Sequence, residues 1–381
     1  MAQTSNPLLQ LKKLGQSPWL DFISREIIDS GDLKRLISKD GITGVTTNPT
    51  IFEKAISSGE VYNGSIERLA EQGKSAEDIY DVLTSHDVSD AAEFLKGVYD
   101  SSGGIDGYVS IETWPKYAHD VDRTIEYARK IYRMVGKDNI LIKVPSTREG
   151  VPAVERLITE GINVNVTLIF SLAHYENIAR AYIQGLKNRE KKGEDLSRVT
   201  SVASVFISRI DTAVDKRLDA LVKEPSNASQ SGDIKKLRGT AAVANSKIIY
   251  SHFQEIFATS EFKALEKKGA KIQRVLWGST GTKDPTYSDI KYVTELIGKN
   301  TINTMPPNTI TAFKDHGVAR ITLTEGLNDA HRVLDKLSGL GIDVDVLCQQ
   351  IQDDGVKAFA DSFDALIAAI ETKRKSFIAK K

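Results

Sequence analysis

The sequence predicts an α/β fold, and within that class a closed (β/α)8 TIM barrel with helical insertions. Short runs of apolar and β-branched residues alternate with long stretches whose apolar residues recur every three or four positions. Such alternation is typical of a parallel sheet, and eight repeats favour a closed barrel. A barrel of this kind takes about 250 residues, so a chain of 381 residues has room for insertions.

The strands and helices can be assigned in order along the chain. Residues 120–136 and 171–188 are the clearest helices, because their apolar residues fall on one helical face. The eight predicted strands are WLDFI (19–23), GVTTN (44–48), GYVSIET (107–113), ILIKVP (140–145), NVNVTLIF (163–170), VTSVASVF (199–206), RVLWGS (274–279) and NTINTM (300–305).

We expect one barrel domain over residues 1–381, since no low-complexity linker or change of composition divides the chain. The polar segment 54–106, between the second and third strands, is predicted to hold two or three inserted helices. Residues 223–233, KEPSNASQSGD, have the composition of an exposed loop. Residues 345–381 are predicted to form a C-terminal helix with a basic, solvated end.

The composition argues against nucleic-acid and membrane partners. Lys plus Arg and Asp plus Glu both number 51, so no net positive field attracts polyanions. Cys348 is the only cysteine, which fits a reducing compartment. The start of the chain lacks the apolar core of a signal peptide, and no apolar run of about 18 residues occurs. We therefore expect a cytoplasmic protein.

Several predicted strands carry a polar face that must point into the barrel, because the outer face packs on helices. Asn165 and Thr167 share one face of their strand, and Glu112 lies on the corresponding face of the third strand. Lys143 interrupts the apolar run ILIKVP, and Asn48 ends the second strand. All but Asn165 lie in the second half of their strands, toward the end where barrel active sites lie.

A lysine among apolar residues has a specific chemical use. Desolvation disfavours the ammonium form, and the neutral amine can attack a ketone to give a Schiff base. The alternative is an interior ion pair between Lys143 and Glu112. The residues alone leave these two interpretations about even.

The quoted strands resemble the motifs of the transaldolases. GVTTNPTIF (44–52), ILIKVPST (140–147) and GINVNVTLIFS (161–171) carry the resemblance, and the shape of the chain is similar to that of the longer, mainly bacterial branch of this family. The segments WLDFIS, SVFISRID (204–211), LWGSTGTKDP (276–285) and NTMPPNT (303–309) follow in the expected order.

The resemblance implies a Schiff-base aldolase type of barrel that transfers a dihydroxyacetone unit between sugar phosphates in the pentose phosphate pathway. The donor would be sedoheptulose 7-phosphate or fructose 6-phosphate. The acceptor would be glyceraldehyde 3-phosphate or erythrose 4-phosphate. The resemblance implies no metal and no organic cofactor, and it is compatible with a homo-oligomer. The sequence contains no HExxH or CxxC metal motif.

Four residues match catalytic positions of the family. Lys143 matches the Schiff-base lysine, and Glu112 the carboxylate that works through a water. Thr167 matches the hydroxyl that holds this water, unless it merely fills the strand. Asp21 matches the acid/base of carbon–carbon cleavage, although an Asp here could instead cap the next helix.

Four further residues match the pocket that holds the dihydroxyacetone unit. Asn48 and Asn165 match amides that bind its hydroxyls, and Ser204 matches a hydroxyl with the same task. Phe206 matches an aromatic wall. The alternatives are a turn residue for Asn48, internal hydrogen bonds for Asn165 and Ser204, and a core side chain for Phe206.

The phosphate site is where the sequence departs from the shorter branch of the family. Arg209 matches a phosphate-binding arginine, with a surface pair to Asp211 as the alternative. Ser279 matches a phosphate-binding serine or else serves the loop turn. The shorter branch has a second arginine where this chain has Gly281, so we weigh Lys283 as its replacement against a solvated loop lysine.

Two other functions remain. One is an aldolase of the fructose 6-phosphate type, a lyase that releases free dihydroxyacetone. The related small aldolases have glutamine where Glu112 stands and tyrosine where Phe206 stands, so both positions favour the transaldolase. The other is a non-catalytic sugar-phosphate-binding barrel, which the joint presence of Lys143, Glu112 and Asp21 disfavours.

Overall fold

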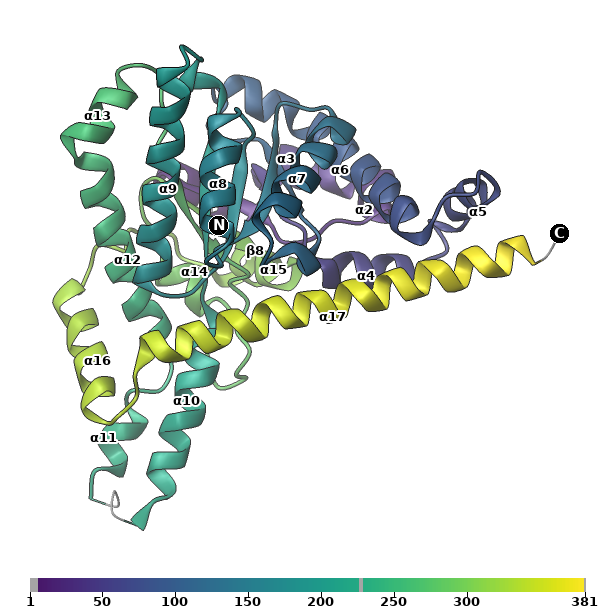
Figure 1. The fold of residues 1–381 in the computed structure, drawn as a ribbon. Helices are drawn as coiled ribbons and strands as arrows, with labels where there is room; N and C mark the ends of the chain where they lie inside the picture. The colour runs from purple at the N-terminus through teal and green to yellow at the C-terminus, as the bar shows by residue number, and fades with distance from the viewer. Residues whose placement is uncertain (1–5, 226–228, 380–381) are drawn as a thin grey trace, which may run out of the picture.

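The computed structural model describes residues 6–225 and 229–379, and they form a closed barrel of eight parallel strands (Figure 1). Each strand pairs with the next along the chain, and β8 pairs with β1 to close the sheet. The predicted fold class is confirmed. The strands are β1 (Gln16–Leu20), β2 (Gly44–Val45), β3 (Tyr108–Glu112), β4 (Ile140–Pro145), β5 (Val164–Ile169), β6 (Ser201–Phe206), β7 (Arg274–Gly278) and β8 (Thr301–Met305).

Two strand predictions need correction. The first strand was expected at 19–23 but lies at Gln16–Leu20, where its five residues pair in register with those of β8. Its polar start and Pro18 hid the pattern, since proline is unusual within a sheet. The second strand ends at Val45 rather than at residue 48, because Asn48 already caps the following helix.

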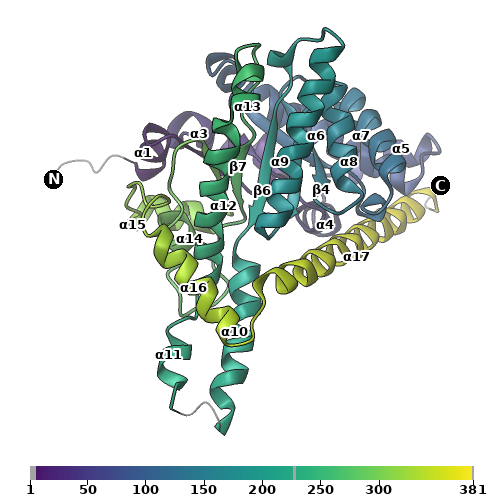
Figure 2. The ribbon, with the colours of Figure 1, turned by 60° about the vertical axis from the view of Figure 1, so that its left-hand side comes forward.

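Helices surround the barrel, and Figure 2 shows them from a second side. Their bounds are α1 (Pro7–Lys13), α2 (Arg25–Asp29), α3 (Asp32–Asp40), α4 (Pro49–Ser58), α5 (Asn63–Glu71), α6 (Ala76–Ser101), η1 (Pro115–Tyr117), α7 (Val121–Val135), α8 (Gly150–Thr159), α9 (Leu172–Lys191), η2 (Leu196–Arg198), α10 (Ser208–Lys223), α11 (Ser231–Lys235), α12 (Ala241–Ala258), α13 (Ser260–Glu266), α14 (Lys291–Thr294), α15 (Pro307–His316), α16 (Leu327–Gly339) and α17 (Val344–Ile378).

The connection between β2 and β3 contains α4, α5 and α6. The long helix α17, drawn in yellow in Figure 1, runs along one end of the barrel and packs against α4, α5 and α6. Residues 223–233 are not one loop as expected: residue 223 ends α10, α11 begins at Ser231, and 226–228 lie outside the described residues.

The interior of the barrel is filled by apolar side chains over part of its length. Trp19 and Tyr108 belong to this filling, together with one residue from each of β4, β6, β7 and β8: Leu141, Val202, Leu276 and Ile302. Ile140, Ile142 and Val144 belong instead to the core between sheet and helices. The alternation expected for ILIKVP is therefore present, with Leu141 and Lys143 facing inward.

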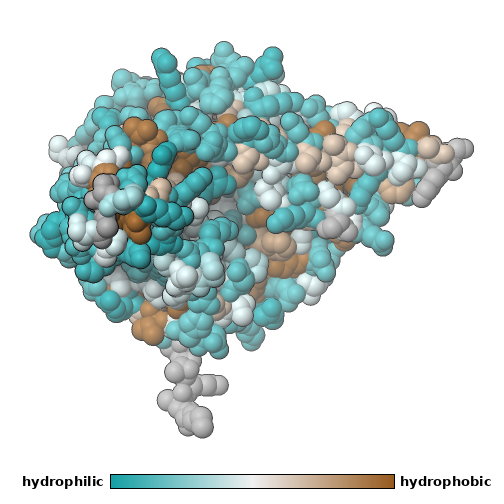
Figure 3. Space-filling view, turned by 90° about the horizontal axis from the view of Figure 1, so that it is seen from below, coloured by the Kyte–Doolittle hydropathy of each residue, from teal (hydrophilic) through white to brown (hydrophobic). Residues whose placement is uncertain are grey.

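No helix among the described residues is long and apolar enough to span a membrane. Figure 3, which views the molecule from below Figure 1, shows a mostly hydrophilic face with scattered apolar patches.

Gly44 tests the packing inside the barrel. A Cβ at this position would lie 2.3 Å from Trp19 Cε2, whose ring is fully buried. We expect Gly44→Ala to lower the free energy of unfolding by about 3 kcal/mol, the upper part of the usual cost of overpacking. Denaturant unfolding followed by circular dichroism measures the change.

Gly97→Ala is the matched control, because Gly97 is exposed near the carboxyl end of α6 and a Cβ there meets nothing within 4 Å. Its helix should gain about 0.5–1 kcal/mol. Equal stability of the two variants would contradict the tight fit of Trp19.

Candidate active site

A cavity of about 230 Å³ opens at the carboxyl ends of the strands, where barrel active sites lie. Nine of the eleven predicted site residues line it, and Glu112 and Asn165 do not. The lining comprises Asp21, Thr46, Asn48, Thr50, Lys143, Thr167, Ser204, Phe206, Ser208, Arg209, Leu276, Gly278, Ser279, Lys283, Thr304 and Phe359.

Lys143 lies at the inner end of this cavity and is paired with Glu112. The two residues are neighbours in the register of β3 and β4, and Lys143 Nζ donates a hydrogen bond to Glu112 Oε1 over 2.8 Å. Both side chains are 5 % exposed. The ion pair that the sequence left open is therefore present.

Thr47 completes the surroundings of the pair. Its carbonyl oxygen accepts a hydrogen bond from Lys143 Nζ at 2.7 Å, and its hydroxyl donates to Glu112 Oε2 at 3.0 Å. The expected purely apolar setting of Lys143 is wrong, because β3 and the TTNP segment bring oxygen atoms to the amine. The carboxylate at 2.8 Å is placed to accept a proton when the amine reacts.

Asp21 follows β1 directly and faces the same cavity. Thr46 Oγ1 donates a hydrogen bond to Asp21 Oδ1 over 2.8 Å. Burial raises the pKa of the Asp21 carboxyl, against the lowering effects of the Lys143 charge and of hydrogen bonds from Thr46 and Ser279. The alternative role as helix cap is wrong, since Ser24 caps α2.

Asn165 and Ser204 form a buried hydrogen-bond chain beside Lys143. Ser204 Oγ donates to Asn165 Oδ1 at 2.6 Å, and Asn165 Nδ2 donates to Ser110 Oγ at 2.9 Å. Asn165 is fully buried and does not line the cavity, whereas Ser204 does. In this structure Asn165 and Ser204 therefore make the internal hydrogen bonds that the sequence left open as the alternative to substrate binding.

Asn48 has both a structural contact and a place in the cavity. Its Oδ1 accepts a hydrogen bond from the backbone N–H of Ile51 at 2.9 Å and so caps α4. The amide NH2 group is what it has left to offer a ligand. Phe206 also lines the cavity and packs on Phe170, with ring centroids 5.6 Å apart.

The lining of the cavity also carries positive charge. Arg209 lies in the first turn of α10, and Lys283 and Ser279 lie in the loop after β7; all three line the cavity. Arg209 does not pair with Asp211 as the alternative proposed, because Asp211 accepts hydrogen bonds from Ala242 N and Tyr292 Oη. Burial lowers the pKa of Arg209, against the nearby Asp354 charge.

Gly281, where the shorter branch has an arginine, is packed closely. A Cβ here would lie 3.2 Å from Thr309 Oγ1 and 3.3 Å from Pro306 Cγ. This loop therefore has little room for a large side chain at 281, and Lys283 brings the positive charge to the cavity instead.

Sequence reasoning missed the contribution of α17. Phe359 from this helix lines the cavity, and Gly355 lies against Arg209, since a Cβ on Gly355 would come within 3.1 Å of Arg209 Nη1. Nothing in the pattern of a helix more than 130 residues beyond β6 signals such contacts. Thr46 and Thr47 were quoted in the TTNP motif, but no role was assigned to them.

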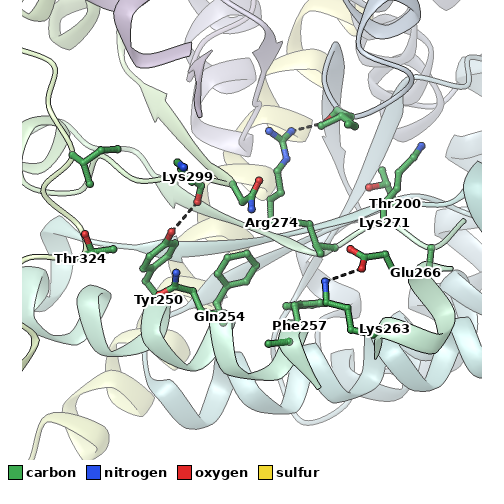
Figure 4. Close-up of a pocket in the computed structure, with 17 residues that line it drawn as sticks. Thr200, Tyr250, Gln254, Phe257, Lys263, Glu266, Lys271, Arg274, Lys299 and Thr324 are labelled. Atoms are coloured by element: carbon green, nitrogen blue, oxygen red, sulfur yellow. Dashed lines mark hydrogen bonds and ion pairs between the residues drawn. The ribbon is translucent and has the colours of Figure 1, made fainter. Parts of the chain in front are cut away.

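A second cavity, of about 730 Å³, lies at the other end of the barrel (Figure 4). Three of its four Lys and Arg side chains are already engaged. Lys263 bonds to Glu266, Lys271 to the Gly104 carbonyl, and Arg274 to the Ile105 carbonyl. The convergent polar groups of a reactive site lie instead around Lys143. Among the described residues no group of three or more His, Cys, Asp and Glu side chains is placed to hold a metal ion.

Comparison with known proteins shows which family the chain belongs to. The family model described as transaldolase/fructose-6-phosphate aldolase matches residues 18–370. A Nostoc protein named transaldolase 2 is 44% identical over 373 residues, which cover 97% of this chain and 98% of the relative. The transaldolase of Trichodesmium erythraeum is similar to the same extent, and that of Mycobacterium marinum is 42% identical over 377 residues, 98% of each chain.

Asp21 gives a prediction on stability. An ionised carboxylate with a raised pKa destabilises the folded state, and this penalty vanishes as the pH falls through that pKa. We expect Asp21→Asn to raise the free energy of unfolding at pH 7, and the gain to shrink toward acid pH. Urea unfolding over a pH series measures it.

Asp335→Asn, which replaces an exposed carboxylate on α16, is the control and should change the free energy of unfolding little. A gain for Asp21→Asn that persists unchanged at acid pH would contradict the desolvation of this group.

Proposed function

Because the chain belongs to the transaldolase/fructose-6-phosphate aldolase family, we propose that it is a transaldolase. It moves a dihydroxyacetone unit from a ketose phosphate, sedoheptulose 7-phosphate or fructose 6-phosphate, to an aldose phosphate, glyceraldehyde 3-phosphate or erythrose 4-phosphate. The observation that carries the proposal is the buried Lys143–Glu112 pair in a cavity that also contains Asp21.

Lys143 forms the covalent intermediate. Its nitrogen attacks the ketone carbon of the donor, and loss of water gives a protonated imine. Glu112, 2.8 Å from the amine, accepts and returns protons through a water held by Thr167. The buried Thr167 Oγ1, which has no hydrogen-bond partner among the described residues, supports this assignment, because a water would satisfy it.

Asp21 serves the carbon–carbon bond. As its carboxylate removes the proton of the donor hydroxyl, the bond between C3 and C4 breaks and the electron pair moves into the protonated imine. The released aldose leaves, and the enamine attacks the acceptor aldehyde. Hydrolysis of the new imine frees the product and restores Lys143.

The remaining residues bind and orient the sugar phosphate. Asn48 and Ser204 bind the hydroxyls of the dihydroxyacetone unit, and Phe206 is the aromatic wall. Asn165 orients Ser204 through their 2.6 Å hydrogen bond. Asn165 Oδ1 can bind a ligand hydroxyl only if that hydroxyl replaces Ser204 Oγ as its donor. At the other end, the donors and charges of Arg209, Ser279 and Lys283 bind the phosphate.

The aldolase alternative is disfavoured by two residues. The small aldolases that resemble transaldolases have glutamine at the position of Glu112 and tyrosine at that of Phe206. Reaction on sugar phosphates of central metabolism also favours a cytoplasmic location for this enzyme, in line with its single cysteine.

Covalent trapping tests the proposal. We expect borohydride with fructose 6-phosphate to reduce the imine and leave the dihydroxyacetone fragment on Lys143, as mapped by peptide mass spectrometry. Lys271→Met, at the far end of the barrel, should still be trapped, whereas Lys143→Met should not. An adduct elsewhere, or none, contradicts the assignment.

A coupled assay separates the two activities in the same experiment. A transaldolase releases glyceraldehyde 3-phosphate from fructose 6-phosphate in continuous turnover only when erythrose 4-phosphate is present. Turnover without an aldose acceptor, accompanied by free dihydroxyacetone, would assign the chain to the aldolases.

Lys283 has its own test. We expect Lys283→Met to raise the KM for fructose 6-phosphate about five- to tenfold with little change in kcat, because it removes a charge-assisted contact to the phosphate in an exposed loop. Lys216→Met is the control, an exposed lysine of the neighbouring cavity that does not line the site. Equal KM values for the two variants would show that Lys283 does not bind phosphate.

A further inference from the structure

Strand β5 contains an irregularity at the residue that follows Thr167. Val166 pairs with Ala203 and Ile169 with Val205, so two residues of β5 oppose the single residue Ser204 of β6. The extra residue is Leu168, which has a φ of +59°. A bulge of this kind shifts which side chains of a strand point inward and often lies next to an active site.

The bulge keeps Thr167 facing the cavity while returning Ile169 to the outer core. The positive φ of Leu168 is unfavourable for leucine, because a left-handed backbone brings the Cβ too close to the following carbonyl. Such strain persists only where surrounding contacts hold it. The Leu168 carbonyl shows what those contacts are.

Two side chains donate hydrogen bonds to the Leu168 carbonyl oxygen. Ser146 Oγ, at the end of β4, donates over 2.9 Å, and Gln352 Nε2, from α17, donates over 3.0 Å. Gln352 Nε2 also lies 2.8 Å from Ser146 Oγ and 3.2 Å from the Ser146 carbonyl oxygen. One amide group thus ties α17 to the ends of two neighbouring strands.

The orientation of the Gln352 amide follows from its neighbours. The carbonyls of Leu168 and Ser146 accept only, so the NH2 group must face them. Its oxygen accepts a hydrogen bond from Gln349 Nε2 at 3.2 Å. Gln352 is 2 % exposed, and a buried amide in the middle of a helix is costly unless such partners satisfy it.

We propose that Gln352 is a positioning residue of the reaction: it holds the Leu168 bulge and thereby the direction of the Thr167 hydroxyl. The inference rests on the proposed function, in which Thr167 holds the water of imine formation and hydrolysis. Loss of the amide donor leaves Ser146 alone on the Leu168 carbonyl and lets β5 relax toward a regular strand. Thr167 then no longer holds the water in line with Lys143 and Glu112.

The test compares Gln352→Leu with Gln350→Leu. Both replace a glutamine on α17, but Gln350 is exposed. With fructose 6-phosphate and erythrose 4-phosphate, we expect Gln352→Leu to lower kcat at least tenfold and to change the KM less than twofold, since the phosphate-binding side chains are untouched. Gln350→Leu should behave as the wild type. Each kcat is calculated per active enzyme molecule. The number of active molecules is the amount of borohydride adduct formed at a saturating concentration of fructose 6-phosphate.

This readout separates positioning from stability. A purely structural role of Gln352 lowers the melting temperature and the adduct count but leaves the kcat of the remaining active enzyme at that of Gln350→Leu, and this result would overturn the inference. If Gln352→Leu does not fold, Ser146→Ala decides, because it removes the other donor to Leu168 with a smaller change. A lowered kcat supports the inference, and an unchanged kcat overturns it. Absence of an adduct on the wild type would instead overturn the proposed function.

Discussion

The buried pair of Lys143 and Glu112 is the interaction on which the organisation of this barrel depends. Two charges that are 5 % exposed must find partners, since removal of one member of such a pair typically costs about 3–5 kcal/mol. The barrel supplies those partners from neighbouring strands. Register places the two residues side by side, and Thr47 at the end of β2 contacts both.

The rest of the interior follows from this requirement. Trp19, Tyr108 and four aliphatic residues fill the barrel below the pair, so the charges face one end of the barrel only. Beside it, hydrogen bonds among Ser204, Asn165 and Ser110 satisfy the polar groups that β6, β5 and β3 turn inward. The polar groups deepest in the barrel thus hydrogen-bond to one another, and the cavity lies next to them.

The predictable part of the site is the part that strand alternation controls. Lys143, Glu112, Asn165 and Thr167 have inward directions that follow from a period of two and from apolar neighbours that must face the helices. The pattern predicts direction but not contact: neither the hydrogen bond of Asn48 to α4 nor the seclusion of Asn165 beneath Ser204 can be read from alternation. The position of β1 was misjudged because its pairing with β8 is a long-range contact that overrides a weak local pattern.

Side chains of α17 illustrate why the remainder escapes sequence reasoning. Gln352, Gly355 and Phe359 come to the site at intervals of three and four residues, so one face of a single helix closes the cavity. The sequence of this face is an ordinary mixture of polar and apolar residues. Its role becomes visible only because the helix docks at the ends of β4 and β5.

Backbone strain marks the same region. Among the described residues, three non-glycine residues have positive φ, and two of them, Leu168 and Ser279, belong to the strands or loops that form the cavity. Each such residue typically costs about 1–3 kcal/mol and needs contacts that hold it. At Leu168 those contacts include a buried helix amide, and at Ser279 the hydroxyl interacts with Asp21. Because helix α17 supplies part of what holds the strain, the geometry around Lys143 depends on a segment 200 residues away in the sequence, and the strands of the barrel alone do not determine it.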